Sequence, residues 1–97
     1  MHGEYKVPGG KLVVVDLAVN DGRLARVQVS GDFFIEPDSA LEQINQALEG
    51  LPADSSAQAM STAIAAALPP QVQLYGLSAE GVAVAVQRAL ASVEPVA

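Results

Sequence analysis

The one concentrated cationic feature of the sequence is a short turn, Lys6-Val7-Pro8-Gly9-Gly10-Lys11. Two adjacent glycines let backbone amides approach an anion closely, and two lysines would neutralise the charge of a phosphate. The spacing differs from a phosphate-binding P-loop, which ends in Gly-Lys-Ser/Thr and opens onto a helix. Here Lys11 opens onto a Val-rich segment that is typical of a strand. A plain strand-to-strand turn, with Lys11 an exposed strand residue, is therefore the competing interpretation.

A second stretch, Gly31-Asp32-Phe33-Phe34, places a carboxylate between a glycine and two aromatic residues. In such a turn the Asp32 carboxylate is expected to accept hydrogen bonds from nearby backbone amides, with contact to a partner, a substrate or a metal as the alternatives. If the segment is extended, Phe33 and Phe34 point to opposite sides. One of them then enters the core, and the other lies on the outer surface, where it can anchor a partner.

The other polar residues favour structural roles over catalysis. Glu36, Asp38, Glu42 and Glu49 surround a helix, where carboxylates cap and solvate it. With no cysteine, the chain has no disulfide, iron–sulfur cluster, thiolate zinc site or cysteine nucleophile. The single histidine, His2, leaves no His pair for a metal and no buried base for a serine nucleophile. The sequence therefore predicts no catalytic residue and no metal site.

The charge balance limits the class of partner. The chain has 5 Lys+Arg against 11 Asp+Glu, a net charge of -6, so it lacks the basic face that nucleic acids and anionic membranes require. No apolar run approaches the roughly 20 residues of a membrane span. With no apolar signal core at the start of the sequence, a cytoplasmic location is the expectation.

These motifs are expected to sit on a single domain, residues 1–97, of α+β class. Strands are predicted at residues 11–19 and 23–34, with residues 4–7 as a third, and three helices follow. Capping boxes predict helix starts at Ser39 and Ser55, and Ser78 caps the last helix, whose apolar stripe runs to Val93. The expected fold is a small three-stranded antiparallel sheet with about three helices packed on one face.

The register of the hairpin formed by residues 11–19 and 23–34 is predicted from the requirement that apolar and polar side chains lie on opposite faces of the sheet. A three-residue loop with Gly22 in the left-handed conformation sets Val15 opposite Val27 and keeps one face apolar, whereas a two-residue Asp-Gly loop mixes the faces. On this register Ala25 is buried and Leu24 lies on the opposite face. Further along, the apolar residues of the last connecting segment are expected to pin it to the core: Val72, Leu74, Tyr75 and Leu77.

Two stretches carry a resemblance to a known family. EYKVPGGKLV (residues 4–13) and GDFFIEP (residues 31–37), with the hairpin between them, resemble the small C-terminal or accessory domain of lipoate–protein ligases. The helix start Leu77-Ser78-Ala79-Glu80 is similar to that family's final helix. The likeness extends from about residue 4 to residue 90, and suits a free accessory subunit or a domain of a longer ligase.

The resemblance implies a place in protein lipoylation. These ligases activate lipoate with ATP and magnesium to lipoyl-adenylate, then transfer the lipoyl group to a lysine of lipoyl carrier domains. Their small domain is in some organisms a separate chain that joins the catalytic subunit and is needed for adenylation. Its fold resembles that of iron–sulfur scaffold and sulfur-acceptor proteins. The Arg-Arg and triple-Gly motif and the catalytic lysine context of the large domain are absent here, so the resemblance implies a component with no activity and no bound cofactor of its own.

The expected partner is the ligase catalytic subunit, which would link the chain indirectly to lipoyl carrier domains and to lipoate or a related acyl group such as octanoate. The implied contact surface comprises the residues of both motifs: Lys6, Val7, Pro8, Gly9, Gly10, Lys11, Gly31, Asp32, Phe33 and Phe34. Two alternatives stay open. One is a protein-interaction module of the same fold with no ligase role, and the other is a sulfur- or cluster-handling relative, which the missing thiols disfavour.

Overall fold

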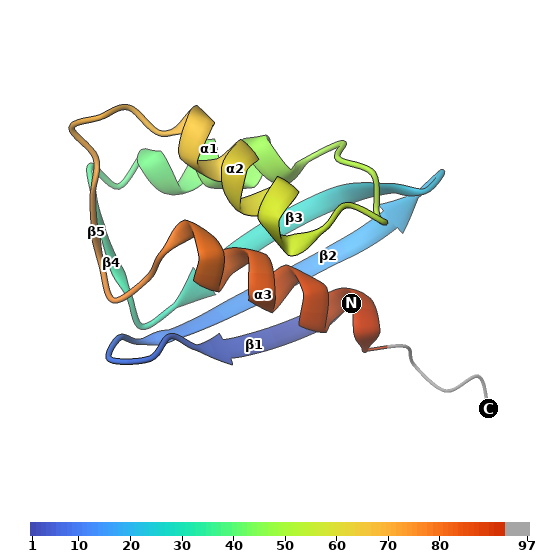
Figure 1. Cartoon of the computed structure of the whole chain (residues 1–97), viewed down its shortest axis with the longest axis horizontal. Helices are drawn as coiled ribbons and strands as arrows, with labels where there is room; N and C mark the ends of the chain where they lie inside the picture. The colour runs from blue at the N-terminus through green and yellow to red at the C-terminus, as the bar shows by residue number, and fades with distance from the viewer. Residues whose placement is uncertain (93–97) are drawn as a thin grey trace.

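The computed structural model describes residues 1–92, which form a three-stranded sheet, a two-stranded sheet and three helices. In chain order the elements are β1 (His2–Lys6), β2 (Leu12–Asn20), β3 (Arg23–Gly31), β4 (Phe34–Glu36), α1 (Ala40–Leu48), α2 (Ala57–Ala67), β5 (Gln73–Tyr75) and α3 (Ala79–Ala91). The larger sheet is antiparallel with the order β1-β2-β3, and the helices cover one of its faces (Figure 1). The expected α+β architecture is therefore confirmed.

The β2–β3 hairpin has a shorter loop than the sequence predicted. Asn20 pairs with Arg23, so the loop is Asp21 and Gly22, with φ of 53° and 73°. Two consecutive positive φ angles are what a type I′ turn requires. The register then shifts within the strands, because Arg26, at a φ of 54°, forms a β-bulge opposite Leu17. The predicted three-residue loop was wrong, because the extra residue lies in the strand. The predicted pairing was wrong as well, since Val15 lies opposite Val29 and not Val27.

The bulge changes which β3 residues face the helices. Leu24 is 1% exposed and belongs to the core, whereas Ala25 is half-buried on the other face, so the predicted places of these two residues were wrong. Beyond the bulge, Val27 and Val29 are buried as expected. One face stays apolar, as the prediction required, because the inserted residue restores the side-chain alternation.

Side chains at the end of α1 complete the hydrogen bonding of β3. Glu49 accepts hydrogen bonds from both bulge amides, Arg26 N at 2.8 Å and Val27 N at 3.1 Å. The buried Asn45 accepts another from Val29 N at 2.9 Å. The two bonds to Glu49 are stronger than bonds to a neutral acceptor, because its carboxylate is charged. Glu49, expected only to cap or solvate a helix, therefore ties α1 to the open edge of the sheet.

Of the three predicted helix caps, only Ser78 is confirmed, although each helix begins within two residues of its predicted cap. Ser39 has helical dihedral angles and makes no side-chain cap bond, so the capping box predicted there was wrong. At α2 the cap is Ser56 rather than Ser55, and its hydroxyl accepts a hydrogen bond from Ala59 N at 3.0 Å. Ser78 caps α3 as expected, by accepting a hydrogen bond from the amide three residues on.

The core lies between the three helices and the larger sheet. The predicted helix stripes supply its centre, with side chains at most 1% exposed: Ile44, Leu48, Met60, Ile64, Val82 and Val86. Val93, expected at the end of the last stripe, lies outside the described residues. None of the helices within residues 1–92 has the length and apolar character needed to cross a membrane.

The strand expected to run through to Phe34 ends instead at Gly31. Phe34–Glu36 forms the separate strand β4, which pairs with β5 in a two-stranded ribbon that the sequence did not predict. Ile35 and Leu74 point from this ribbon towards the core, while the alternate side chains are exposed. Tyr75 is one of these exposed residues, so its predicted role in the core was wrong.

A charged cluster joins β1 to β2 on the face of the sheet away from the helices. The His2 ring contacts Glu4 through Nε2 and Asp16 through Nδ1, each at 2.7 Å, and these hydrogen bonds raise the pKa of His2 above its usual 6.5, Glu4 most strongly. A raised pKa stabilises the fold below pH 6.5, and the gain is lost as the pH rises through the folded-state value.

We therefore expect His2→Gln to lower the melting temperature at about pH 5.5 and to have almost no effect at about pH 8.5. Thermal melts of the wild type and the variant at both pH values check this. Gln28→Ala is the control, because Gln28 is an exposed residue of β3 that does not titrate, so its substitution should change the melting temperature equally at the two pH values. An equal loss of stability at both pH values would contradict it.

Candidate functional site

The glycine–lysine turn (residues 6–11) connects β1 to β2 and is held by its own backbone hydrogen bonds and by one side chain that packs against α3. Gly10 N donates to Val7 O at 2.8 Å, and Val7 N donates to Lys11 O at 3.1 Å. The Val7 side chain packs against α3, where a Cβ at Gly81 would lie 2.7 Å from it. Pro8 and Gly9 form the exposed tip. Val7 therefore holds the turn in place, and the residues around it remain accessible.

The structure places the two lysines of the turn on opposite faces of the hairpin. Lys6 pairs with Leu12, whereas Lys11 pairs with Val7, whose side chain faces α3. Neighbouring residues of a strand point to opposite sides, so Lys6 lies on the outer face of the sheet. The interpretation in which both lysines neutralise one phosphate is thereby weakened, although both side chains are exposed.

The diphenylalanine corner (residues 31–34) begins where β3 ends. Gly31 has a φ of 147°, and a Cβ there would lie 2.1 Å from Leu12 O, so only glycine fits against β2. The next residue, Asp32, donates its backbone N–H to Leu12 O at 3.2 Å. Its carboxylate is exposed and accepts no hydrogen bond within residues 1–92, so the expected bonds to turn amides do not form there.

The two phenylalanines of the corner separate as predicted. Phe33 is half-buried and packs against the core, whereas Phe34 is 56% exposed. The exposed ring has an aromatic neighbour from a distant part of the chain: the centroids of Phe34 and Tyr75 lie 6.0 Å apart, with the ring planes at 53°. This pair forms the outer face of the β4–β5 ribbon.

Gly76 brings the two motifs together. Its carbonyl accepts a hydrogen bond from Lys11 N at 2.8 Å, and a Cβ on Gly76 would lie 2.5 Å from Lys11 Cγ. Because Gly76 directly follows Tyr75, the glycine–lysine turn lies beside the ribbon that carries Phe34. Both are found at the same end of the molecule, at the left in Figure 1.

The surface formed there contains most, but not all, of the residues expected from the sequence. Seven side chains or backbone segments are exposed: Lys6, Pro8, Gly9, Lys11, Gly31, Asp32 and Phe34. The other three, Val7, Gly10 and Phe33, are partly buried. Sequence reasoning missed Tyr75 as a surface residue. The signal was the alternation Gln73-Leu74-Tyr75, which matches Phe34-Ile35-Glu36 in its exposed, inward, exposed order.

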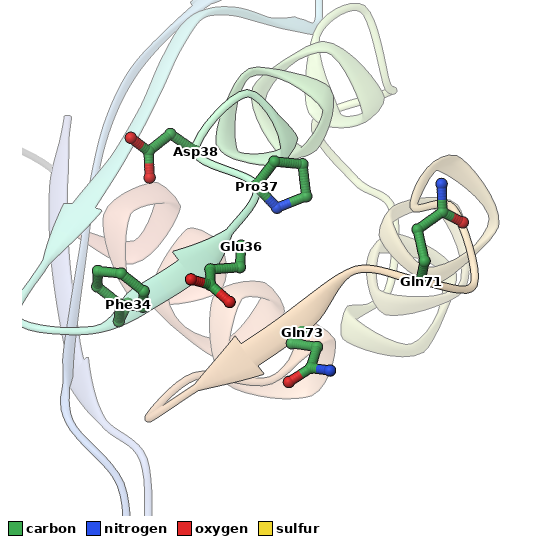
Figure 2. Close-up of a pocket in the computed structure, with 6 residues that line it drawn as sticks. All are labelled: Phe34, Glu36, Pro37, Asp38, Gln71 and Gln73. Atoms are coloured by element: carbon green, nitrogen blue, oxygen red, sulfur yellow. The ribbon is translucent and has the colours of Figure 1, made fainter.

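Two shallow hollows flank Phe34. One, of about 490 Å³, lies between Phe34, Glu36, Pro37 and Asp38 on the β4 side and Gln71 and Gln73 on the β5 side (Figure 2). The other, of about 260 Å³, shares Phe34 and Asp38 and extends to Ser30 and Leu41. Both are open, which suits contact with a protein surface better than enclosure of a small ligand.

The described part of the chain, residues 1–92, contains no group of three or more His, Asp or Glu side chains arranged to hold a metal ion. The one histidine ring is already engaged by Glu4 and Asp16. The end of the molecule described above is an exposed surface in which aromatic side chains are bordered by polar ones.

Comparison with known proteins supports a fold assignment. No protein-family model and no curated protein sequence matches the chain. Among solved structures, it is similar to a chain of an archaeal lipoylation system from Thermoplasma acidophilum, which comprises a bi-partite lipoate protein ligase and its E2 lipoyl domain. The TM-score is 0.72 at 21% sequence identity, covering 89% of this chain and 92% of that one. The chain thus has the fold of one component of that lipoylation system.

Proposed function

We propose that this chain is a non-catalytic partner of a separate lipoate–protein ligase subunit and supports ATP-dependent formation of lipoyl-adenylate. The observation that carries the proposal is the fold shared, over almost the full length of both chains, with a component of a bi-partite ligase system. The two motifs that resemble the small ligase domain add support, because the fold brings them to one surface.

In this proposal the chain docks through the surface at the end of the sheet and helps to close the adenylation site of its partner. Adenylation places negative charge at the α-phosphate, and exclusion of water protects the mixed anhydride that forms. The tip of the glycine–lysine turn offers exposed backbone and Lys11, whose aliphatic part rests on Gly76. We assign ATP, magnesium and lipoate to the catalytic subunit, because residues 1–92 provide no ligand cluster for the metal.

The archaeal system also contains a lipoyl domain, so an acyl-acceptor role is the second candidate. An acceptor must present a lysine amine to the ligase. Lys6 and Lys11 are the lysines of this chain, but neither occupies the tip of the turn, which is formed by Pro8 and Gly9. This placement favours a docking role over an acceptor role.

Reconstitution tests the proposal. With ATP, magnesium and lipoate, we expect the catalytic subunit to form lipoyl-adenylate at least about tenfold faster when this chain is present, equivalent to a barrier lower by about 1.4 kcal/mol. The measurement is lipoyl-adenylate by chromatography and pyrophosphate release. Equal rates with and without the chain would overturn the proposal.

Two further arms of the same experiment identify the role. Lys11→Ala is expected to reduce the stimulation more than Lys6→Ala, the matched control on the opposite face of the hairpin. The intact mass of the chain, measured after incubation with the catalytic subunit, should be unchanged. A mass increase of one lipoyl group would instead make this chain an acceptor.

A further inference from the structure

The outer face of the β4–β5 ribbon carries an unusual concentration of exposed apolar surface. Phe34 is 56% exposed and Tyr75 is 47% exposed, and their rings form a tilted pair. Within residues 1–92 the other exposed large apolar side chains are Met1, at 49%, and Val19, at 36%, and neither is part of an aromatic pair. Adjacent exposed aromatic residues mark a surface that a partner covers, because aromatic side chains dominate the energetics of interfaces.

Carboxylates border this aromatic pair. Glu36 lies on the same ribbon face as Phe34, and Asp38 lines both hollows beside the Phe34 ring (Figure 2). Both carboxylates are exposed. The ion pairs present within residues 1–92 are those of His2, so Glu36 and Asp38 have no cationic neighbour in the described part of the chain. The ribbon face therefore combines apolar area with unneutralised negative charge.

The surrounding sequence strengthens this charge. Between residues 27 and 87 there is no Lys or Arg at all, whereas there are seven carboxylates: Asp32, Glu36, Asp38, Glu42, Glu49, Asp54 and Glu80. Of these, Glu49 is bound to the bulge amides. The ribbon and its neighbour α1 thus carry acidic side chains and no basic one. A partner with a basic face is complementary to them.

We propose that the ribbon face binds an arginine-bearing surface of the ligase catalytic subunit, with one arginine seated between the Phe34 ring and the carboxylates of Glu36 and Asp38. This inference rests on the proposed function for the identity of the partner. A guanidinium stacks on aromatic rings and binds a carboxylate through two parallel hydrogen bonds, so arginine satisfies both features of the site. A second copy of this chain is a poor occupant, because each copy has a net charge of -6.

The site lies beside the glycine–lysine turn without including it. Lys11 is joined to Gly76, on the far side of Tyr75 from Glu36. The complete docking surface would therefore have lysine at one side of the aromatic pair and carboxylates at the other. Such an arrangement of opposite charges fixes the orientation of a partner, because turning it around would place like charges together.

The test is a binding titration of this chain against the isolated catalytic subunit, by calorimetry, at low and at physiological salt. The double variant Glu36→Gln/Asp38→Asn removes two charges and keeps the side-chain shapes, and Phe34→Ala removes the stacking surface. We expect each to raise Kd by roughly tenfold or more, and the double variant also to weaken the dependence of Kd on salt. The control Asp21→Asn/Asp54→Asn removes two exposed charges beside the β2–β3 turn, where Ala53 N donates to Gly22 O, and should leave Kd within about twofold.

The outcomes separate this inference from the proposed function. If the wild-type chain binds and the ribbon variants weaken binding while the control does not, the inference is supported. If the wild-type chain binds and the ribbon variants bind equally well, the arginine site is wrong although the docking function stands. If the wild-type chain does not bind the catalytic subunit at all, both fail. Circular dichroism of each variant, expected to be unchanged since these side chains are exposed, excludes unfolding as the cause.

Discussion

Leu24→Ala is expected to lower the free energy of unfolding by about 3 kcal/mol, within the usual range for a large-to-small change in a core. Leu24 is 1% exposed, and removal of its side chain leaves a cavity between β3 and the helices. Its backbone hydrogen bonds, from Gly50 N and to Leu51 O, do not depend on the side chain. Urea denaturation followed by circular dichroism measures the change.

The neighbouring residue is the matched control. Ala25 is half-buried on the opposite face, where a longer side chain can extend into solvent, so Ala25→Lys should change stability by less than about 1 kcal/mol. The unbulged register that the sequence predicts reverses both expectations, since it buries Ala25 and exposes Leu24. A stable Leu24→Ala together with an unfolded Ala25→Lys would therefore show that the hairpin has no bulge.

Gly3→Ala is expected to destabilise the fold by at least about 2 kcal/mol, although it adds a single methyl group. Gly3 is buried where β1 passes under α3, and a Cβ there would lie 2.3 Å from both Ala85 O and Ala89 N. These are backbone atoms of a helix and cannot rotate away. The helix must move off the strand, which loosens the packing of its own buried side chains, such as Val82 and Val86. Thermal melting and urea denaturation measure the loss.

Gly22→Ala separates this steric effect from backbone strain. Gly22 has a φ of 73°, and a Cβ there would have no heavy atom within 4 Å. Its substitution should therefore cost only about 1 kcal/mol, the typical penalty for a left-handed conformation with a side chain. If Gly3→Ala were no worse than Gly22→Ala, the close contact between β1 and α3 would be wrong.

The residues that determine stability and the exposed residues proposed to bind a partner lie in different parts of the molecule. The core, the bulge and the contact between β1 and α3 determine stability, and they lie away from the exposed end of the sheet. The turn and the ribbon at that end carry exposed side chains, such as Lys11 and Phe34, that take little part in the core. Variants of these residues are therefore expected to alter partner binding and adenylation with little change in melting temperature.

Patterns within short segments were enough to predict much of the fold. A Val-rich segment of sufficient length identified β2, and apolar residues three and four apart, such as Val82 and Val86, identified the helix faces. Ser78 caps its helix as predicted, because an extended serine directly before a helix brings its hydroxyl to the amide three residues on. The predicted contact surface remains a proposal, but its two motifs could be selected from the sequence because each is contiguous.

What only the tertiary structure decided involves residues far apart in the chain. The bulge at Arg26 depends on Glu49, which lies on another element and supplies two acceptors for amides that the hairpin leaves free. The ribbon exists because Phe34 meets Tyr75 across a three-residue pairing too short to stand out in a pattern. Local sequence determines which way neighbouring side chains can point. Local sequence does not determine which amide, aromatic ring or glycine from a distant part of the chain those side chains contact, since that depends on the packing of the whole chain.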